Sequence, residues 1–458
     1  MAVFSVIKLS DLEGAKRIDA EYYKPEYLEI ENKIKNKSIN TIREISFFVK
    51  KGIFDISPEL YTPKGIPFIR IQNIRKGFLV EEDLVFISEA SHNIEKKTEL
   101  TSYDLVLSKV GTIGEVSLIP SKFRKVNFSQ NVIGVKIDKS RIYPGYLLTF
   151  LLTKFGQFQL ERAQMPQVQS KLELEPVRDI KVIRIGGLEE KIHELVLKSE
   201  NQFELSKSLY IQAENLLLEE LGLKDFKPKY KKTYTANLSS AFSAHRIDAE
   251  YFQPAYDEII EKLKEKNIRL EPLRKLILGI QKGTEPGSEN YRDEGKPFIR
   301  VSNLSIHGFV DRDQKYLSEE LYQILKETYE PKPGDLLLTK DATPGIAYVV
   351  KEQIEGIISS GILKLQINQN EINKEYLALC INSIIGKMQI EKDGGGSVII
   401  HWKPEQVKKL KIPILPLETQ QKIASLVQQS HDARKKAIAL LEEAKRRVEE
   451  EIENQAAL

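Results

Sequence analysis

The chain has 458 residues, 41% of them hydrophobic and 29% charged, a balance typical of globular proteins and not of disordered chains. No apolar run approaches the roughly 18–20 residues of a membrane span, and the N-terminus lacks the pattern of a secretory signal peptide. The net charge of +3 neither requires nor excludes a nucleic-acid partner, because Lys and Arg can gather on one face of a nearly neutral protein. The single cysteine, Cys380, excludes an intramolecular disulfide. We therefore expect a cytoplasmic protein in which Cys380 is a buried thiol.

The first expected element is an amphipathic helix over residues 19–35. Four of its apolar side chains fall at helical spacing, which predicts that they point into a core. They are Tyr23, Tyr27, Ile30 and Ile34.

β-strands are expected next, within an α+β domain. Residues 66–74 and 134–138 alternate apolar and polar side chains, as a strand with one solvent-facing side does. Residues 105–107 are continuously apolar, which predicts a buried strand. Gly111 and Gly114 then mark a tight turn.

A long helix follows, since residues 189–221 contain neither Gly nor Pro. Apolar and small residues recur there at alternating spacings of four and three, the pattern of a coiled-coil seam. The seam consists of Ile192, Val196, Ser199, Phe203, Ser206, Tyr210, Ala213 and Leu217. Residues 224–244 lose this periodicity and carry Pro228 and several lysines, so we interpret them as a linker. Its lysines either contact phosphate or are only solvated.

The second half of the chain repeats the first. The hexapeptide Arg-Ile-Asp-Ala-Glu-Tyr at residues 17–22 recurs at residues 246–251, and Pro-Phe-Ile-Arg at residues 67–70 recurs at residues 297–300. Such matches are separated by 229 to 231 residues. This long, nearly constant offset indicates duplication of a whole domain with its helix and not a solenoid of short repeats.

The second long helix is expected over residues 418–452 and keeps the same seam. Its positions are Ile423, Val427, Ser430, Arg434, Ala437, Leu441, Ala444 and Val448. Two equal units pack best through an isologous contact around a pseudo-twofold axis. We therefore expect the two helices to pair antiparallel, as a strut with one globular domain at each end.

In the order of its motifs the chain resembles the specificity (S) subunits of type I restriction–modification systems. The resemblance is carried by the doubled hexapeptide, the Pro-Phe-Ile-Arg-x-x-Asn strands, and Asp-Leu-x-Leu-x-Lys at residues 104–109 and 335–340. Pro-Ile-Leu-Pro-Leu-Glu-x-Gln at residues 413–420 adds to it. The resemblance covers essentially the whole chain. The two halves differ at residues 129–131 (Ser-Gln-Asn) and 359–361 (Ser-Ser-Gly).

The resemblance implies an α+β fold in which two tandem-repeated α/β target-recognition domains are joined by two long antiparallel coiled-coil helices around a pseudo-twofold axis. The first domain is expected over residues 1–186 and the central conserved helix over residues 187–223. A linker over residues 224–244, the second domain over residues 245–416 and the distal conserved helix over residues 417–458 complete the chain.

The resemblance also implies a non-catalytic subunit that binds double-stranded DNA and no membrane. Each domain is expected to recognise one half of a bipartite site, while the helices set the gap and dock two methyltransferase (M) subunits. Restriction/translocase (R) subunits join this complex. The chain itself is expected to need no cofactor, because S-adenosylmethionine, ATP and Mg belong to the partner subunits.

Sequence readout needs side chains that reach base edges, whereas phosphate contacts only set position. Residues 164–171 and 394–403 lie at matching places but differ in content, as readers of different half-sites should. We predict DNA contacts from Gln164, Gln167, Gln169, Lys171, Ser397, His401 and Lys403. The alternative is that both stretches are ordinary surface loops.

Residues that repeat between the halves are poor candidates for readout, because different half-sites need different readers. Scaffold or phosphate roles are expected for Arg70, Asn73, Arg300 and Asn303. Lys109 and Lys340 are candidate DNA contacts as phosphate clamps, or else structural residues. The divergent stretches 50–61 and 281–291 are further candidates, and Glu285 in the second either accepts from cytosine or is only solvated.

Signals for catalysis are missing. The sequence contains no Gly-x-x-x-x-Gly-Lys-Ser/Thr loop, no Asn/Asp-Pro-Pro-aromatic segment of the kind amino-methyltransferases use, and no metal-ligand spacing among its six histidines. We predict no catalytic residue and no metal site. Two alternatives stay open: a two-headed non-catalytic scaffold that binds a protein or another ligand, and a nuclease or methylase without recognisable motifs.

Overall fold

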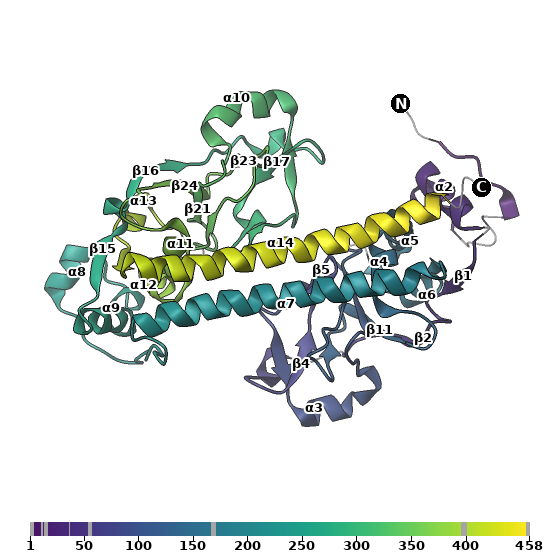
Figure 1. The fold of residues 1–458 in the computed structure, drawn as a ribbon, viewed down its shortest axis with the longest axis horizontal. Coiled ribbons are helices and arrows are strands. Elements are labelled where there is room, and N and C mark those ends of the chain that lie inside the picture. Colours follow the sequence, from purple (N-terminus) through teal and green to yellow (C-terminus); the bar gives the residue numbers. More distant parts are fainter. Residues whose placement is uncertain are drawn as a thin grey trace. The chain divides into compact units, whose positions relative to one another are not determined.

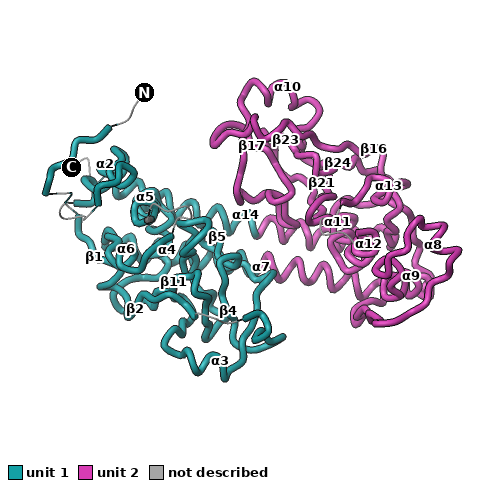
Figure 2. The backbone as a smooth tube through the Cα atoms, turned by 180° about the vertical axis from the view of Figure 1, so that it is seen from behind, with its two compact units in different colours: residues 1–204, 434–458 teal, residues 205–433 magenta. Residues whose placement is uncertain are grey.

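The computed structural model describes residues 4–10, 12, 17–35, 37–53, 57–165, 171–394 and 401–454. It divides the chain into two compact units (Figure 2). Unit 1 contains residues 1–204 and 434–458, and unit 2 contains residues 205–433. The division falls inside the two long helices, α7 (Leu188–Glu220) and α14 (Leu417–Asn454), so each unit includes a segment of both (Figure 1). The expected domain boundaries after residues 186 and 416 lie at the N-terminal ends of these helices.

A four-stranded antiparallel sheet forms the centre of unit 1, with strand order β2-β11-β8-β9. β2 spans Ser46–Lys51, β11 Val132–Ile137, β8 Leu105–Ser108 and β9 Val116–Leu118. β8 is buried along its whole length, which confirms the predicted buried strand. The alternation predicted for residues 134–138 is wrong, because only Lys136 of β11 is not buried.

Both faces of this sheet are covered, which explains the missing alternation. Ile133 and Val135 of β11 belong to one apolar cluster, and their neighbour Val132 belongs to another. A strand covered on both faces needs apolar side chains at successive positions. The sheet is therefore an internal layer of unit 1.

A second sheet of unit 1 has the order β10-β4-β7-β3. Its strands are β10 (Asn127–Phe128), β4 (Ile66–Ile69), β7 (Val85–Ile87) and β3 (Tyr61–Thr62). The single strand predicted over residues 66–74 is wrong, because the 3-10 helix η3 (Ile71–Asn73) separates β4 from β5 (Ile74–Arg75). Asn73 causes this break. Its Oδ1 accepts from the Arg70 N–H at 2.9 Å, and its Nδ2 donates to the Val80 carbonyl at 3.0 Å.

The helix predicted over residues 19–35 begins later than expected. The 3-10 helix η1 (Ala20–Tyr23) precedes α2 (Pro25–Lys35), and Lys24 between them is not helical. The residue before a proline is sterically disfavoured in a helix, so Pro25 sets the helix start. Of the four expected core residues, Tyr23, Ile30 and Ile34 are buried and Tyr27 is half-buried.

The remaining elements of unit 1 cover the sheets and connect them. α4 (Pro144–Leu152) contacts β9, and α5 (Lys154–Arg162) contacts α2. The others are β1 (Ile39–Thr41), η2 (Pro58–Leu60), β6 (Phe78–Leu79), α3 (Glu89–Ile94), η4 (Lys96–Thr98), β12 (Gln164–Met165), β13 (Lys171–Leu172), α6 (Leu174–Arg178) and β14 (Lys181–Ile183).

Unit 2 repeats this architecture. Its antiparallel sheet has the order β16-β24-β21-β22, formed by β16 (Ile277–Lys282), β24 (Ile362–Ile367), β21 (Leu336–Thr339) and β22 (Ala347–Val349). A second sheet has the order β20-β17-β23, formed by β20 (Lys315–Leu317), β17 (Lys296–Ile299) and β23 (Ile357–Ile358). Phe298 of β17 pairs in parallel with Ile357, as Phe68 of β4 pairs with Asn127 in unit 1. The backbone pairing is therefore duplicated together with the sequence.

The other elements of unit 2 follow the same order. They are α8 (Leu238–Ala244), η5 (Glu250–Phe252), α9 (Ala255–Glu265), β15 (Arg269–Pro272), η6 (Leu273–Lys275), η7 (Ser288–Asn290), η8 (Val301–Asn303), β18 (Leu304–Ser305), β19 (Gly308–Phe309), α10 (Glu319–Tyr329), α11 (Lys374–Asn382), α12 (Ile384–Gly394), α13 (Pro404–Val407) and β25 (Lys411–Ile414). The linker expected over residues 224–244 thus contains the helix α8, which the prediction missed. Leu238 and Phe242, four residues apart, supply a short helical pattern after the lysine-rich part.

The two long helices pair within unit 1. The Ser199 hydroxyl donates to the Ala437 carbonyl at 2.7 Å, and the Arg434 guanidinium lies 4.7 Å from the centre of the Phe203 ring. The step from Ser199 to Phe203 follows α7 forward, whereas the step from Ala437 to Arg434 follows α14 backward. The two segments are therefore antiparallel.

The helices also pair within unit 2, where the Ser430 hydroxyl donates to the Ser206 carbonyl at 2.7 Å. Small side chains at these positions let the helix backbones approach closely. The large side chains expected in the seam are all buried: Ile192, Val196, Phe203, Tyr210, Leu217, Ile423, Val427, Leu441 and Val448.

Candidate nucleic-acid interface

The segment predicted to recognise the first half-site begins and ends in a short hairpin. β12 (Gln164–Met165) pairs antiparallel with β13 (Lys171–Leu172), which brings the two ends of the segment together. Gln164 and Lys171 are both half-buried. Gln167 and Gln169 lie outside the described residues.

The matching segment of unit 2 presents two of its three predicted residues to solvent. His401 and Lys403 are exposed, and Ser397 lies outside the described residues. His401 Nδ1 lies 2.8 Å from Asp341 Oδ1. Trp402 between them is buried and donates from its indole Nε1 to the Asp393 carboxylate at 3.0 Å. The buried Trp402 anchors the backbone that presents its two neighbours.

Lys109 and Lys340 lie at the ends of equivalent strands, directly beside these segments. The Lys109 carbonyl accepts from the Leu172 N–H at 2.9 Å, and the Lys340 carbonyl accepts from the Trp402 N–H at 2.8 Å. The Lys340 side chain is 11% exposed and lies 2.5 Å from Asp341 Oδ2. Burial acts to raise the pKa of Asp341, but hydrogen bonds from Lys340 and His401 outweigh it and lower that pKa. This ion pair favours the structural alternative for Lys340.

The doubled hexapeptide places an arginine against the start of the first candidate segment. Arg17 binds Asp19 through two hydrogen bonds of 2.8 and 2.5 Å, and its guanidinium lies 4.5 Å from the centre of the Tyr22 ring. Arg17 Nη1 also donates to the carbonyl oxygens of Arg162 at 3.3 Å and Gln164 at 2.9 Å. Arg17 therefore holds the first residue of the hairpin in place.

Arg246 makes the equivalent contacts in unit 2. It binds Asp248 through hydrogen bonds of 2.8 and 2.6 Å, lies 4.7 Å from the centre of the Tyr251 ring, and donates to the Asp393 carbonyl at 2.7 Å. The hydrogen bond from Arg246 lowers the pKa of Asp248. Sequence analysis took the hexapeptide only as a mark of duplication. Its doubled Arg-x-Asp spacing was the available signal for this contact.

A pocket of about 500 Å³ opens in unit 1 where β4 ends. Polar side chains dominate its wall, and they come from η3, from the loop after β10 and from the chain before β4. They include Ser57, Tyr61, Arg70, Gln72, Gln130 and Asn131. The stretch 50–61 was among the predicted candidates, whereas the three amides were missed. The difference between residues 129–131 and 359–361 was the signal that could have found two of them.

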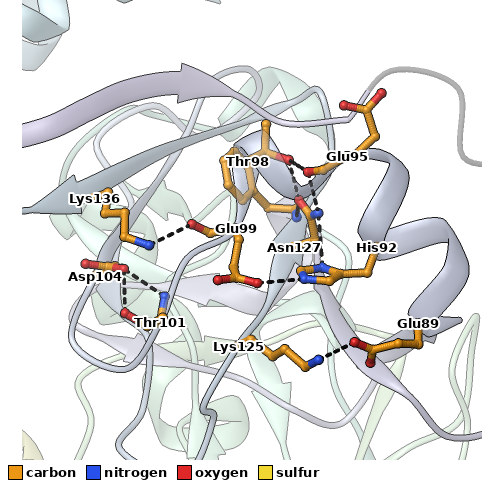
Figure 3. Close-up of polar contacts among 11 residues, drawn as sticks. Glu89, His92, Glu95, Thr98, Glu99, Thr101, Asp104, Lys125, Asn127 and Lys136 are labelled. Carbon is orange, nitrogen blue, oxygen red and sulfur yellow. Dashed lines mark hydrogen bonds and ion pairs between the residues drawn. The ribbon is translucent and has the colours of Figure 1, made fainter.

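A buried polar network supports one wall of this pocket (Figure 3). His92, on α3, is buried, and its Nε2 lies 2.8 Å from Glu99 Oε2. The Thr98 hydroxyl donates to Asn127 Oδ1 at 2.8 Å, and Asn127 Nδ2 donates to the Glu95 carbonyl at 3.3 Å. These bonds fix β10 immediately before residues 129–131, so the network has a structural role.

Two kinds of feature are absent from the described part of the chain. No group of three His, Cys, Asp or Glu side chains there is arranged to hold a metal ion. None of the helices described combines the length and the apolar character that crossing a bilayer requires.

Comparison with known proteins identifies the family. Residues 275–446 match the family model described as the type I restriction modification DNA specificity domain. A protein of Methanocaldococcus jannaschii, named as the type I restriction enzyme MjaX specificity subunit, is 24% identical over 397 residues, which cover 85% of this chain and 84% of the relative. The chain belongs to the type I specificity-subunit family. The resemblance found in the sequence is thereby confirmed, and this specificity subunit is non-catalytic.

Other specificity subunits show the same relationship at lower coverage or identity. The EcoBI specificity subunit of Escherichia coli is 24% identical over 255 residues, which cover 54% of this chain and 50% of the relative. The solved S subunit from M. genitalium is 14% identical, with a TM-score of 0.40, and the alignment covers 90% of this chain and 95% of that one.

Proposed function

We propose that this specificity subunit recognises a bipartite site in double-stranded DNA, with one half-site bound by each unit. The observation that carries the proposal is one backbone framework present twice, with different polar side chains at equivalent positions. Two unlike half-sites need two readers of the same build and different side chains. A chain that bound one symmetric ligand twice would have no reason to differ there.

The proposed architecture has two target-recognition domains, residues 1–186 and 245–416, joined by α7 and α14 as an antiparallel coiled coil around a pseudo-twofold axis. The pairing of α7 and α14 inside each unit supports this arrangement, as does the burial of their small seam residues. In this proposal the coiled coil sets the gap between the half-sites and docks two methyltransferase subunits. Restriction/translocase subunits join the complex through those partners.

The chemistry in this proposal belongs to the partners. The specificity subunit binds no cofactor, while S-adenosylmethionine serves the methyltransferase subunits and ATP with Mg serves the restriction/translocase subunits. A cytoplasmic location follows from such a function.

A gel-retention experiment with a random pool of double-stranded DNA tests the proposal. The chain is assayed alone and together with its methyltransferase partner, and the retained DNA is sequenced. We expect a gapped, two-part motif from the partnered complex. Retention without sequence preference would contradict the proposal and favour a two-headed scaffold, whereas turnover by the isolated chain would favour an enzyme.

A further inference from the structure

The pocket of unit 1 presents amide groups that the protein does not use. Gln72 and Asn131 are exposed and Gln130 is half-buried. Within the described part of the chain, none of these three side-chain amides makes a hydrogen bond. Each amide offers one acceptor oxygen and two N–H donors. The pocket therefore presents free donors and acceptors around a cavity of about 500 Å³.

The backbone around this pocket recurs in unit 2. Ile53 pairs in parallel with Ser129, and Thr284 pairs in parallel with Ser359. The Ser129 N–H donates to the Ile69 carbonyl at 2.9 Å, and the Ser359 N–H donates to the Ile299 carbonyl at 2.8 Å. The same framework is thus built twice.

Two equivalent glycines make this framework possible. A Cβ on Gly52 would lie 2.1 Å from the Phe128 carbonyl oxygen, and a Cβ on Gly283 would lie 2.3 Å from the Ser359 carbonyl oxygen. No side chain fits at either position, because the backbones approach too closely. Both units therefore preserve the close approach that places the pocket loop.

The aromatic and arginine residues of the wall are also shared. The Tyr61 and Phe68 ring centres lie 6.1 Å apart, and those of Tyr291 and Phe298 lie 5.4 Å apart. The arginine after each of these strands donates to a backbone carbonyl: Arg70 to that of Asp83, and Arg300 to that of Asp313. With its Nη2 occupied in this way, Arg70 does not present a free bidentate fork to a guanine.

The side chains that point from this framework differ between the units. Gln72 in η3 is replaced by Ser302 in η8, and Gln130 is replaced by Ser360. In unit 2 the Glu285 carboxylate accepts from the Tyr291 hydroxyl at 2.9 Å and from the Ser360 hydroxyl at 3.4 Å. Unit 1 thus offers neutral amides where unit 2 offers hydroxyls and a carboxylate.

We infer that this pocket is a base-reading site of unit 1, and that Gln72, Gln130 and Asn131 recognise adenine in its half-site. This inference rests on the proposed function and deepens it. Gln and Asn side chains match the N7 acceptor and N6 amino donor that adenine presents in the major groove. At the equivalent place in unit 2, Glu285 is an acceptor only and matches the amino group of cytosine. The two half-sites therefore differ in base at equivalent positions.

The experiment exchanges residues between the units. In the full chain, Gln72→Ser and Gln130→Ser are combined, which installs the side chains that unit 2 carries on the same framework. The variant is assembled with its methyltransferase partner and selected against a random pool of double-stranded DNA. We expect one adenine preference to fall by roughly 5- to 150-fold, the discrimination that one bidentate contact provides. The other half-site stays unchanged and serves as the internal control.

Two further variants sharpen the test. Asn93→Ala removes an exposed amide of unit 1 that does not line the pocket, and it should leave both half-sites unchanged. Glu285→Gln should alter only the half-site that the exchange variant leaves intact. Thermal unfolding of each variant establishes that it is folded.

The outcomes separate the two levels of the proposal. A wild-type complex without any sequence preference would overturn the proposed function itself. A selective wild type whose exchange variant keeps the adenine preference would overturn only the inference. Equal loss at both half-sites by a folded exchange variant would also overturn it, because it would indicate phosphate contact in place of base readout.

Discussion

Ser199 on α7 donates its hydroxyl hydrogen to the carbonyl oxygen of Ala437 on α14, inside an apolar seam where both residues are buried. This bond satisfies a polar group that the seam excludes from water. It also allows a residue as small as serine at a position where the two helices approach closely. The contact therefore has a steric and a polar component that substitutions can separate.

Substitution of Ser199 measures these two components. Ser199→Ala removes the hydrogen bond and keeps the size, so the free energy of unfolding should fall by about 0.5–1.5 kcal/mol. Ser199→Leu adds volume to a packed seam and should cost about 1–3 kcal/mol. Urea unfolding followed by circular dichroism measures both. If leucine were as stable as alanine, the helices would not be in close contact there.

Arg17 should control the first candidate segment and not the second. Arg17→Ala removes charge-assisted hydrogen bonds to the carbonyl oxygens of Arg162 and Gln164, each worth about 1.5–3 kcal/mol. We expect faster hydrogen–deuterium exchange at the hairpin of residues 164–172 and about tenfold weaker preference at one half-site.

Arg246→Ala is the matched control for this prediction. Because Arg246 contacts the Asp393 carbonyl in unit 2, its removal should weaken preference at the other half-site only. Loss of the same half-site in both variants would contradict a role in positioning two separate segments.

The pH dependence of stability should depend on Asp393. Burial raises the pKa of this carboxyl and outweighs the opposing hydrogen bond from Trp402. The folded state therefore binds this proton more tightly than the unfolded state does. Its contribution to stability is fully present below the ordinary value of 3.8 and is lost as pH rises through the raised pKa.

Asp393→Asn tests this sign, because it keeps the acceptor oxygen and cannot ionise. The difference in unfolding free energy between the variant and the wild type should shift in favour of the variant as pH rises from about 4 to about 7. Urea titrations across this range measure the shift. A variant that loses stability relative to the wild type as pH rises would show that the ionised carboxylate is favoured in the folded state.

Cys380 should not react in the folded protein. Its thiol is buried, and burial raises its pKa to about 12, so the thiolate that reacts with disulfide reagents is rare at neutral pH. We expect no labelling of the native chain by a coloured disulfide reagent and complete labelling in denaturant. Rapid reaction of the native chain would indicate local opening of α11.

The proposed gap-setting role of the helices can be tested by insertion. Four residues added after Glu204 in α7 and four added after Ala433 in α14 lengthen each helix by about 6 Å. We expect a spacer longer by about two base pairs, at about 3.4 Å each, and unchanged half-sites. Sequencing of DNA selected by the partnered complex measures this. Altered half-sites with an unchanged spacer would contradict the role.

The features that the sequence predicted best depend on local periodicity. The seam positions, such as Leu217 and Val448, recur every three or four residues, and this spacing is enough to mark the buried face of a helix. Burial on both faces of β8 followed equally from its continuous apolar run.

Features that depend on distant contacts were harder to predict. The strand expected over residues 66–74 is interrupted because Asn73 binds the Val80 carbonyl, a contact that alternation does not reveal. Gln72 meets Gln130 only through the parallel pairing of β4 with β10, which are far apart in the chain. A parallel pairing needs a long connection and leaves no periodic trace in the sequence.

The division of α14 between the units has a consequence for biosynthesis. Leu441, Val448 and Ile452 complete the apolar cluster that also holds Ile30 and Ile192. A ribosome releases these residues last, although the rest of that cluster is among the first to emerge. The earliest-made half of the molecule must therefore wait for the end of translation before its core can close, and a message cut short after residue 416 would leave that core open to chaperones and proteases.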